Sequence, residues 1–113
     1  MKNPAVLEWI KAGAAKAEIV FSICTGALIL ARTELLDGLT ATTHHGAIAE
    51  LEQAAPHTQI DAARRFIDNG KVITAAGVAA GIEASFHVIA RLLGKEQALE
   101  TATYIEYDWK LSE

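Results

Sequence analysis

The single cysteine of this chain stands where a strand is predicted to turn into a helix. Residues 18–23, just before Cys24, are rich in β-branched and aromatic side chains, and residues 25–32 are helix formers. Ser22 and Gly26 flank the cysteine at positions −2 and +2, where a sharp strand-to-helix turn needs small side chains. A thiol at a helix N-terminus also faces the positive end of the helix dipole, which favours thiolate. We therefore predict that Cys24 is a nucleophile, the alternative being a buried structural cysteine.

The residues after the cysteine offer hydrogen-bond donors. The backbone N–H groups of Thr25 and Gly26 directly follow the predicted nucleophile, where donors can stabilise a developing oxyanion. The Thr25 hydroxyl has a second interpretation, in which it only caps the helix. The sequence leaves both interpretations open.

Two adjacent histidines form a second candidate group. Residues 40–43 are predicted as a short strand, and His44 and His45 follow at its C-terminal end, where α/β sheets present functional groups. We take His44 as a candidate catalytic residue and expect His45 and His57 to face solvent. No zinc site is expected, because the spacing of the cysteine and the histidines matches no known ligand pattern.

The remaining elements follow from apolar periodicity and from capping and turn residues. We predict, in chain order, a helix over 4–14, a strand over 18–23, a helix over 25–36, a short strand over 40–43, a helix over 46–55, a hairpin over 64–74, a helix over 82–93 and a last helix over about 95–106.

Two segments in the second half of the chain predict a turn and a loop. Asp68-Asn69-Gly70 lies between two β-rich runs and predicts a hairpin turn. Residues 75–81 are small and predict a loop in which the backbone approaches another group closely.

Glu83 and His87 are spaced as an i, i+4 pair on an exposed helix face. The two tryptophans, Trp9 and Trp109, are expected to pack against the core or an interface.

Alternating strands and helices predict an α/β fold with a mainly parallel sheet. The chain supplies about two parallel strands and a hairpin, whereas sheets of this type usually hold more strands. We therefore expect an incomplete sheet.

Composition narrows the class of protein. The chain has 113 residues, a formal net charge of −4 and one cysteine. We see no basic cluster that would bind nucleic acid directly, and we expect neither a leader nor a membrane-spanning segment. We expect a soluble cytoplasmic protein without a cofactor, acting on a small molecule.

Several motifs taken together resemble the ThiJ/PfpI superfamily, in the branch that holds isonitrile hydratases and the sensor domains of AraC-type regulators. The motifs are Ser22-Ile-Cys-Thr-Gly26, Leu35-Leu-Asp-Gly38 with Ala41-Thr-Thr-His44, Phe66-Ile-Asp-Asn-Gly-Lys-Val-Ile-Thr74, Ala76-Gly-Val-Ala-Ala-Gly-Ile82 and Ile105-Glu-Tyr-Asp108. The resemblance covers nearly the whole chain. It implies the fold of class I glutamine amidotransferases, a flavodoxin-like three-layer sandwich.

The resemblance also implies roles for the candidate residues. Cys24 matches the family nucleophile, the Thr25 hydroxyl would touch substrate, and Gly77 would line the pocket. His44 would act as base in amidase-like members, or would only line the pocket in the isonitrile hydratase branch. The implied activity is that of a cysteine-dependent hydratase or hydrolase acting on an isonitrile, amide or aldehyde.

Residues 1–113 depart from the family pattern in one respect. The family has a further N-terminal portion, which supplies the first strands, a glycine-rich oxyanion segment and the acid that hydrogen-bonds the cysteine. Residues 1–113 therefore resemble the C-terminal portion of one such domain. We expect a homo-oligomer or a complementing chain. The alternatives to an enzyme are a non-catalytic ligand-sensing domain of the AraC-regulator type and an inactive half-domain that needs a partner.

Overall fold

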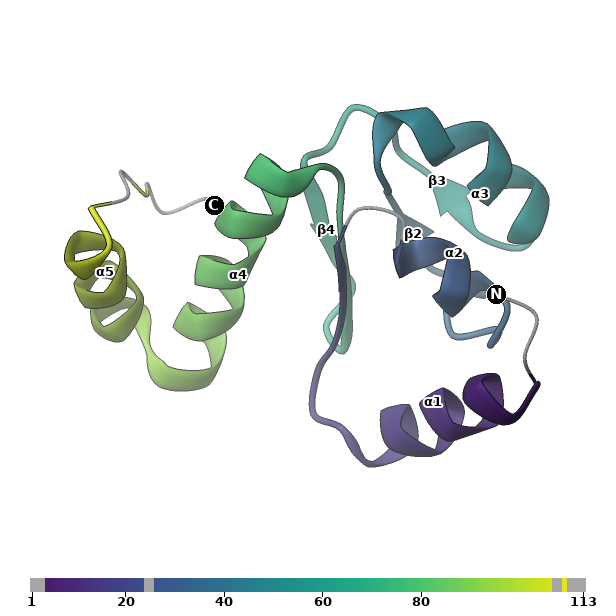
Figure 1. Ribbon diagram of the computed structural model, residues 1–113, viewed down its shortest axis with the longest axis horizontal. Coiled ribbons are helices and arrows are strands. Elements are labelled where there is room, and N and C mark those ends of the chain that lie inside the picture. Colours follow the sequence, from purple (N-terminus) through teal and green to yellow (C-terminus); the bar gives the residue numbers. More distant parts are fainter. Residues whose placement is uncertain (1–3, 24–25, 107–108, 110–113) are drawn as a thin grey trace.

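The protein folds into a small mixed α/β unit (Figure 1). The computed structural model describes residues 4–23, 26–106 and 109. In chain order the elements are α1 (Pro4–Lys16), β1 (Val20–Ile23), α2 (Gly26–Ala31), β2 (Thr40–Ala41), the 3₁₀ helix η1 (His45–Ala47), α3 (Ile48–Ala54), β3 (Gln59–Ile60), β4 (Phe66–Asp68), β5 (Val72–Ala75), α4 (Val78–Leu93) and α5 (Lys95–Tyr104).

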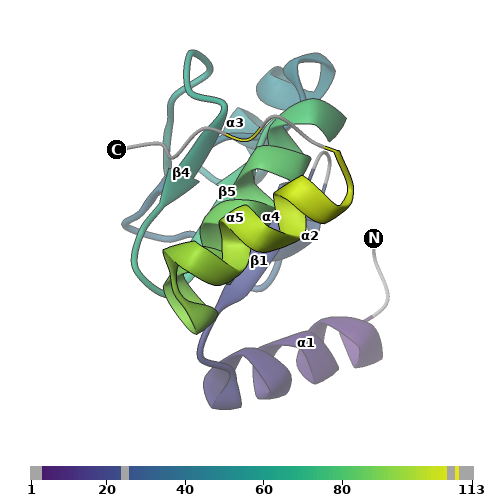
Figure 2. The same cartoon turned by 90° about the vertical axis from the view of Figure 1, so that its left-hand side faces the viewer.

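The strands form two short sheets. The larger has the order β1-β5-β4, with β1 parallel to β5 and β4 antiparallel to β5. The smaller pairs β2 with β3 in parallel. Helices α2 and α3 lie on one side of the larger sheet and α4 and α5 on the other, as the two views agree (Figures 1 and 2). The predicted α/β class with few, mainly parallel strands is confirmed.

Side chains join the two sheets. The Asn69 amide donates to the Thr40 carbonyl at 2.7 Å, and its oxygen accepts from the Thr40 N–H at 3.3 Å. Deeper in the fold, the Thr42 N–H donates to the buried hydroxyl of Thr74 at 2.9 Å. The predicted strand over 40–43 is therefore a ladder strand only at its first two residues, and the backbone of Thr42 is held by the Thr74 side chain.

Two apolar clusters hold the layers together. One lies between the larger sheet and α2 and α3, and it includes Leu36 and Leu51, which are fully buried. The other joins α4 to α5 and includes Phe86 and Trp109, whose ring centroids are 5.6 Å apart. Trp109 packs as predicted, whereas Trp9 is 76% exposed and so does not lie in this core. Within the described part of the chain, no helix is long and apolar enough to cross a bilayer.

Two helix boundaries differ from the sequence prediction by several residues. Helix α2 ends at Ala31 instead of residue 36, because the Thr33 hydroxyl bonds the Leu30 carbonyl at 2.7 Å and Glu34 has φ +64°. Helix α4 begins at Val78 instead of residue 82, so residues 78–81 are a first helical turn and not a loop.

The short strand β3 was not predicted. Its two residues carry no alternating pattern of their own, and the strand exists only through its pairing with β2.

Candidate active site and a second polar cluster

Ser22 and Gly26, the residues on either side of the predicted turn, lie close together. Ser22 is buried, and a Cβ built on Gly26 would lie 3.3 Å from the Cβ of Ser22. This is tighter than an ordinary carbon–carbon contact, so a side chain at position 26 would require Ser22 to shift by a few tenths of an ångström. The predicted nucleophile Cys24 and the predicted substrate contact Thr25 lie outside the described residues.

The start of α4 lies against the same strand end. A Cβ on Gly81 would lie 2.6 Å from Cγ2 of Ile23, so the close backbone approach predicted for residues 75–81 occurs at Gly81. Gly77 is the N-cap of α4, with extended backbone at φ −99° and ψ −175°. No described atom lies within 4 Å of a Cβ built there, so the backbone of Gly77 borders open space.

His44 is held by the turn that it begins. Its Nδ1 accepts a hydrogen bond from the Gly46 N–H at 3.1 Å, which caps η1, and its ring stacks on His45 with centroids 4.3 Å apart. Because Nδ1 uses its lone pair for the cap, the neutral imidazole carries its proton on Nε2. In this geometry His44 can donate a hydrogen bond through Nε2 and has no free basic nitrogen. His44 is half-buried, whereas His45 and His57 are exposed as expected.

A chain of buried polar residues connects this histidine to the elbow strand. Ser22 on β1 pairs in register with Thr74 on β5, and the Thr74 hydroxyl accepts the Thr42 N–H two residues before His44. Thr42 and Thr43 are almost fully buried, which fixes the backbone that leads to the histidine. The Ser22 hydroxyl is buried without a hydrogen-bond partner among the described residues.

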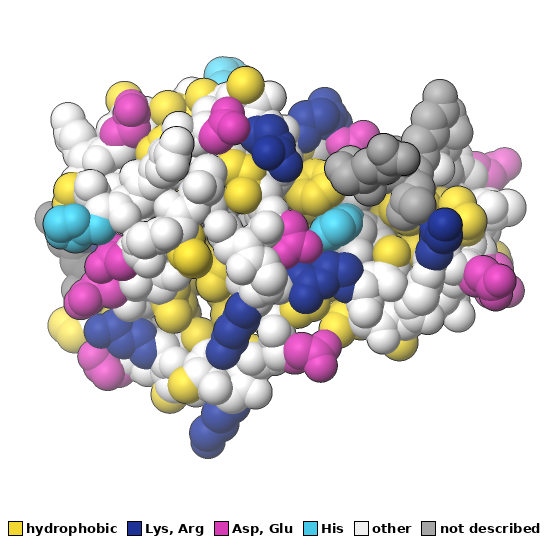
Figure 3. All heavy atoms as spheres, turned by 180° about the vertical axis from the view of Figure 1, so that it is seen from behind, with side chains coloured by type: hydrophobic (Ala, Val, Ile, Leu, Met, Phe, Trp, Pro, Cys, Tyr) yellow, Lys and Arg dark blue, Asp and Glu magenta, His cyan; other side chains and the backbone are white. Residues whose placement is uncertain are grey.

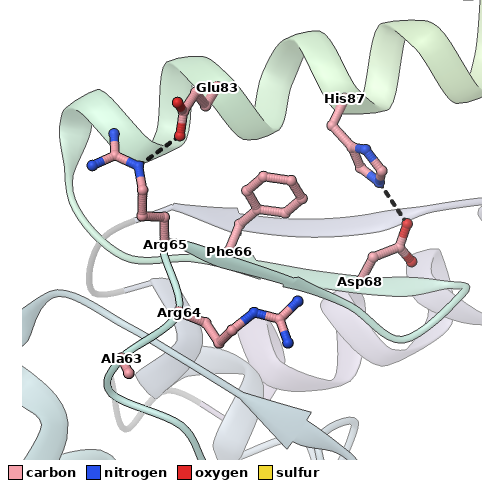
Figure 4. Close-up of a pocket in the computed structure, with 7 residues that line it drawn as sticks. All are labelled: Ala63, Arg64, Arg65, Phe66, Asp68, Glu83 and His87. Atoms are coloured by element: carbon pink, nitrogen blue, oxygen red, sulfur yellow. Dashed lines mark hydrogen bonds and ion pairs between the residues drawn. The ribbon is translucent and has the colours of Figure 1, made fainter. Parts of the chain in front are cut away.

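A second polar cluster lies between α4 and β4 (Figure 4). The sequence predicts Glu83 and His87 as a pair with each other on an exposed helix face. Instead, Glu83 accepts from Arg65 Nε at 2.6 Å, and His87 Nε2 lies 2.7 Å from an Asp68 carboxylate oxygen. The prediction was wrong because both side chains turn toward the β4–β5 hairpin, where they find stronger partners. Arg91 joins the cluster by two contacts of 3.1 Å to Asp68.

The environment of Asp68 changes its acidity. Burial by itself would raise the pKa of this carboxyl, but the hydrogen bonds from His87 and the Gly70 N–H and the charges of Arg91 and His87 outweigh it. The pKa of Asp68 is therefore lowered from its ordinary value. Sequence reasoning missed this cluster, although the i, i+4 spacing of Glu83 and His87 did place the two on one helix face.

Metal-binding groups were searched for in the described ranges 4–23, 26–106 and 109. No set of three or more His, Cys, Asp or Glu side chains lies close enough together there to hold an ion.

Comparison with known proteins decides the family. The family model described as DJ-1/PfpI matches residues 1–91. The chain belongs to the DJ-1/PfpI family. Among curated relatives, it is 32% identical over 110 residues to an isonitrile hydratase of Pseudomonas putida, covering 95% of this chain and 46% of that protein. It is 31% identical over 100 residues to the HTH-type transcriptional regulator CdhR of Pseudomonas aeruginosa, covering 88% of this chain and 30% of the regulator.

Solved structures of the DJ-1/PfpI family agree with the fold. A ThiJ/PfpI family protein from Pseudomonas syringae matches with a TM-score of 0.84 and 28% identity, over 98% of this chain and 45% of that one. Drosophila melanogaster DJ-1beta matches with a TM-score of 0.80 at 16% identity, over 96% of this chain and 56% of that one, and so supports the fold alone. The chain spans about half of the isonitrile hydratase, 46% of its length, and less of the regulator.

Proposed function

We propose that this chain is the C-terminal portion of a DJ-1/PfpI-type domain in which Cys24 attacks a small polarised carbon of the isonitrile, amide or aldehyde class. The observation that carries the proposal is the close approach of Ser22 and Gly26 on either side of Cys24, where a Cβ at position 26 would lie 3.3 Å from the Cβ of Ser22. The 32% identity to an isonitrile hydratase supports the substrate class.

The proposed chemistry uses the groups around the elbow. For an isonitrile, the Cys24 thiolate adds to the terminal carbon, and this carbon takes up a proton from a water molecule that the Nε2–H of His44 positions by a hydrogen bond. The hydroxide left behind adds to the resulting thioimidate, its proton passes to the nitrogen, the thiolate leaves and the N-substituted formamide is released. The N–H groups of Thr25 and Gly26 stabilise the charge that develops when hydroxide adds, and Gly77 lets the substrate approach the backbone.

The larger sheet suggests a partner for the complete site. Within the described residues, β1 pairs with β5 alone, so its other edge has unpaired backbone groups. We propose that a strand of a second chain pairs there, either from another copy or from a chain that carries the remaining portion of the domain. Light scattering should then find more than one chain per particle, whereas a stable monomer would count against the pairing.

The reactivity of the thiol tests the proposed nucleophile. We expect iodoacetamide to alkylate Cys24 at pH 7 faster than it alkylates free cysteine, because an activated thiol has a larger thiolate fraction. A rate no higher than that of free cysteine would contradict the activation. Formamide production from an alkyl isonitrile, lost in Cys24→Ser, tests turnover.

Two variants separate the structural role of His44 from its chemical role. Asn is a good N-cap, so His44→Asn retains an acceptor for the Gly46 N–H but removes the imidazole proton. His44→Ala removes both. We expect His44→Asn to keep the wild-type stability and lose turnover; unchanged turnover in His44→Asn would exclude His44 as the group that positions the water.

A ligand-sensing domain without catalysis is the second candidate. The 31% identity to a transcriptional regulator favours it. In that case Cys24→Ala would retain small-molecule binding and the wild type would show no turnover. The isonitrile assay and the alkylation assay together therefore distinguish the two candidates.

A further inference from the structure

Asn69 is followed by Gly70 at the turn of the β4–β5 hairpin, and an asparagine before a glycine is prone to deamidation. In this reaction the backbone nitrogen of the following residue attacks the side-chain carbonyl carbon, and a glycine hinders the attack least because it has no Cβ. The other asparagine of the sequence, Asn3, precedes Pro4, whose nitrogen carries no proton. Asn69 is therefore the one asparagine of the chain that can react by this route.

The chemistry of this site needs only water. The Gly70 nitrogen bonds to the side-chain carbonyl carbon of Asn69 and loses its proton to solvent, and the side-chain nitrogen takes up a proton and leaves as ammonia. The resulting cyclic succinimide is opened by water at either of its carbonyl carbons. The product at position 69 is aspartate or isoaspartate, and one water has been consumed for each ammonia released.

The folded structure holds the side-chain amide of Asn69 away from this reaction. The amide nitrogen donates to the Thr40 carbonyl at 2.7 Å and to the Val72 carbonyl at 3.3 Å, and the amide oxygen accepts from the Thr40 N–H at 3.3 Å. Ring closure turns the side chain toward its own backbone and makes the amide carbon tetrahedral. It therefore has to break the two-point contact with Thr40.

The attacking nitrogen is also held. The Gly70 N–H donates to an Asp68 carboxylate oxygen at 2.7 Å. A negative charge this close stabilises the proton and so disfavours the deprotonated nitrogen that attacks. Asp68 is in turn bonded to His87 and Arg91, and Figure 3 shows charged side chains of both signs around a histidine near the middle of one face.

The contact that protects Asn69 joins the hairpin to a short strand. Strand β2 has only two residues, Thr40 and Ala41, and such small units open more easily than the core of a fold. A second bond holds the same region, because the Thr42 N–H donates to the buried Thr74 hydroxyl of β5 at 2.9 Å. Separation of β2 from the hairpin would release the Asn69 amide.

We propose that Asn69 is a deamidation site whose reactivity is controlled by the contact between β2 and the β4–β5 hairpin. While the contact is closed the reaction is slow, and when β2 separates Asn69 reacts as in a flexible chain. The carboxylate of the product cannot donate to the Thr40 carbonyl and repels that oxygen, so the original contact does not form again. The proposal does not depend on the reaction proposed for Cys24.

A comparison of deamidation rates at pH 7 tests the protection. The full chain is compared with a synthetic peptide of residues 66–71, the segment that trypsin releases by cleaving after Arg65 and Lys71. Mass spectrometry of this segment measures the fraction converted to the acid. We expect the full chain to react at least about tenfold more slowly than the peptide, because more than one hydrogen bond must break. Equal rates would overturn the proposal.

Variants distinguish local opening from unfolding of the whole chain. Thr74→Val removes the acceptor of the Thr42 N–H, so it should speed both deamidation and hydrogen exchange of the Thr40 amide by about tenfold. Thr74→Ser retains the hydroxyl and should react at the wild-type rate. Phe86→Leu weakens the apolar cluster between α4 and α5 and should change neither rate. The proposal fails if Thr74→Val leaves deamidation unchanged, or if Phe86→Leu speeds it equally.

The aspartate product can be studied directly as Asn69→Asp. In this variant the Thr40 amide should exchange its hydrogen with solvent faster than in the wild type, because the bridge to position 69 is lost. Exchange of the Thr40 amide at the wild-type rate would show that deamidation leaves the contact closed, which contradicts the proposal.

Discussion

Gly81 of α4 lies directly against Ile23 at the end of β1, since a Cβ on Gly81 would lie 2.6 Å from the Ile23 Cγ2. Non-bonded carbon atoms pack at about 3.5–4.0 Å, so only glycine permits this contact without a shift. The contact sets how closely the first turn of α4 approaches the strand that leads to Cys24.

Replacement of Gly81 by alanine should therefore destabilise the protein. Overpacking of this kind costs about 1–3 kcal/mol, which exceeds the gain of up to about 1 kcal/mol that alanine has over glycine inside a helix. We expect a net loss of up to about 2 kcal/mol in the free energy of unfolding, measured by urea denaturation.

Gly13 is the matched control for this substitution. It lies inside α1, and no described atom is within 4 Å of a Cβ built there. Gly13→Ala should raise the free energy of unfolding by about 0.5–1 kcal/mol, the backbone entropy effect alone. Equal effects of Gly13→Ala and Gly81→Ala would contradict the close contact with Ile23.

Ser22 gives a second test of packing at the elbow. Its buried hydroxyl has no hydrogen-bond partner among the described residues, so Ser22→Ala should leave the free energy of unfolding within about 0.5 kcal/mol. Ser22→Val adds methyl groups beside Gly26 and should cost about 1–3 kcal/mol. Urea denaturation of both variants measures the difference, and a costly Ser22→Ala would reveal a hydrogen bond that the hydroxyl makes.

Asn69 has a role beyond the hairpin turn. Its amide bridges to both backbone groups of Thr40, so Asn69→Asp should lose the donated bond and place a charge near the Thr40 carbonyl. Asp suits the turn as well as Asn, so the substitution removes the bridge to Thr40 together with a longer bond of 3.3 Å from the same amide to the Val72 carbonyl. We expect a loss of about 1–3 kcal/mol in unfolding free energy.

An amide-to-acid change on the surface controls for the added charge. Gln97→Glu lies in the first turn of α5 at an exposed position and should change stability by less than about 0.5 kcal/mol. The same small effect in Asn69→Asp would mean that the bridge between the sheets contributes nothing measurable.

The Asp68 network should make stability depend on acid pH. The pKa of Asp68 is lowered in the folded state, so the ionised carboxylate stabilises the fold above its unfolded pKa near 3.8. This contribution is lost as the pH falls through the lower folded pKa. Asp68→Asn should reduce stability at pH 7 and flatten the decline below about pH 4, which chemical denaturation at several pH values measures. A decline as steep as in the wild type would show that the network does not supply it.

The sequence determined the features that depend on neighbours along the chain. Asp68-Asn69-Gly70 predicts the hairpin turn that the structure contains, with Gly70 at φ +95°, and the small residues Ser22 and Gly26 predict the close approach found between them. Both are set by the backbone geometry of a few consecutive residues, so local side-chain size and turn preference are sufficient. Apolar periodicity is also a local property of the chain, so it predicted the helices. It did not predict all of the residues at which they begin and end.

Tertiary structure decided which distant groups meet. Glu83 and His87 look like partners at helical spacing, but the packing of α4 on β4 gives them Arg65 and Asp68 instead. The sequence likewise could not predict that His44 Nδ1 accepts the hydrogen bond that caps η1, which leaves the imidazole proton on Nε2. Partner choice depends on the register and distance between elements, and the spacing of residues along the chain does not encode these directly.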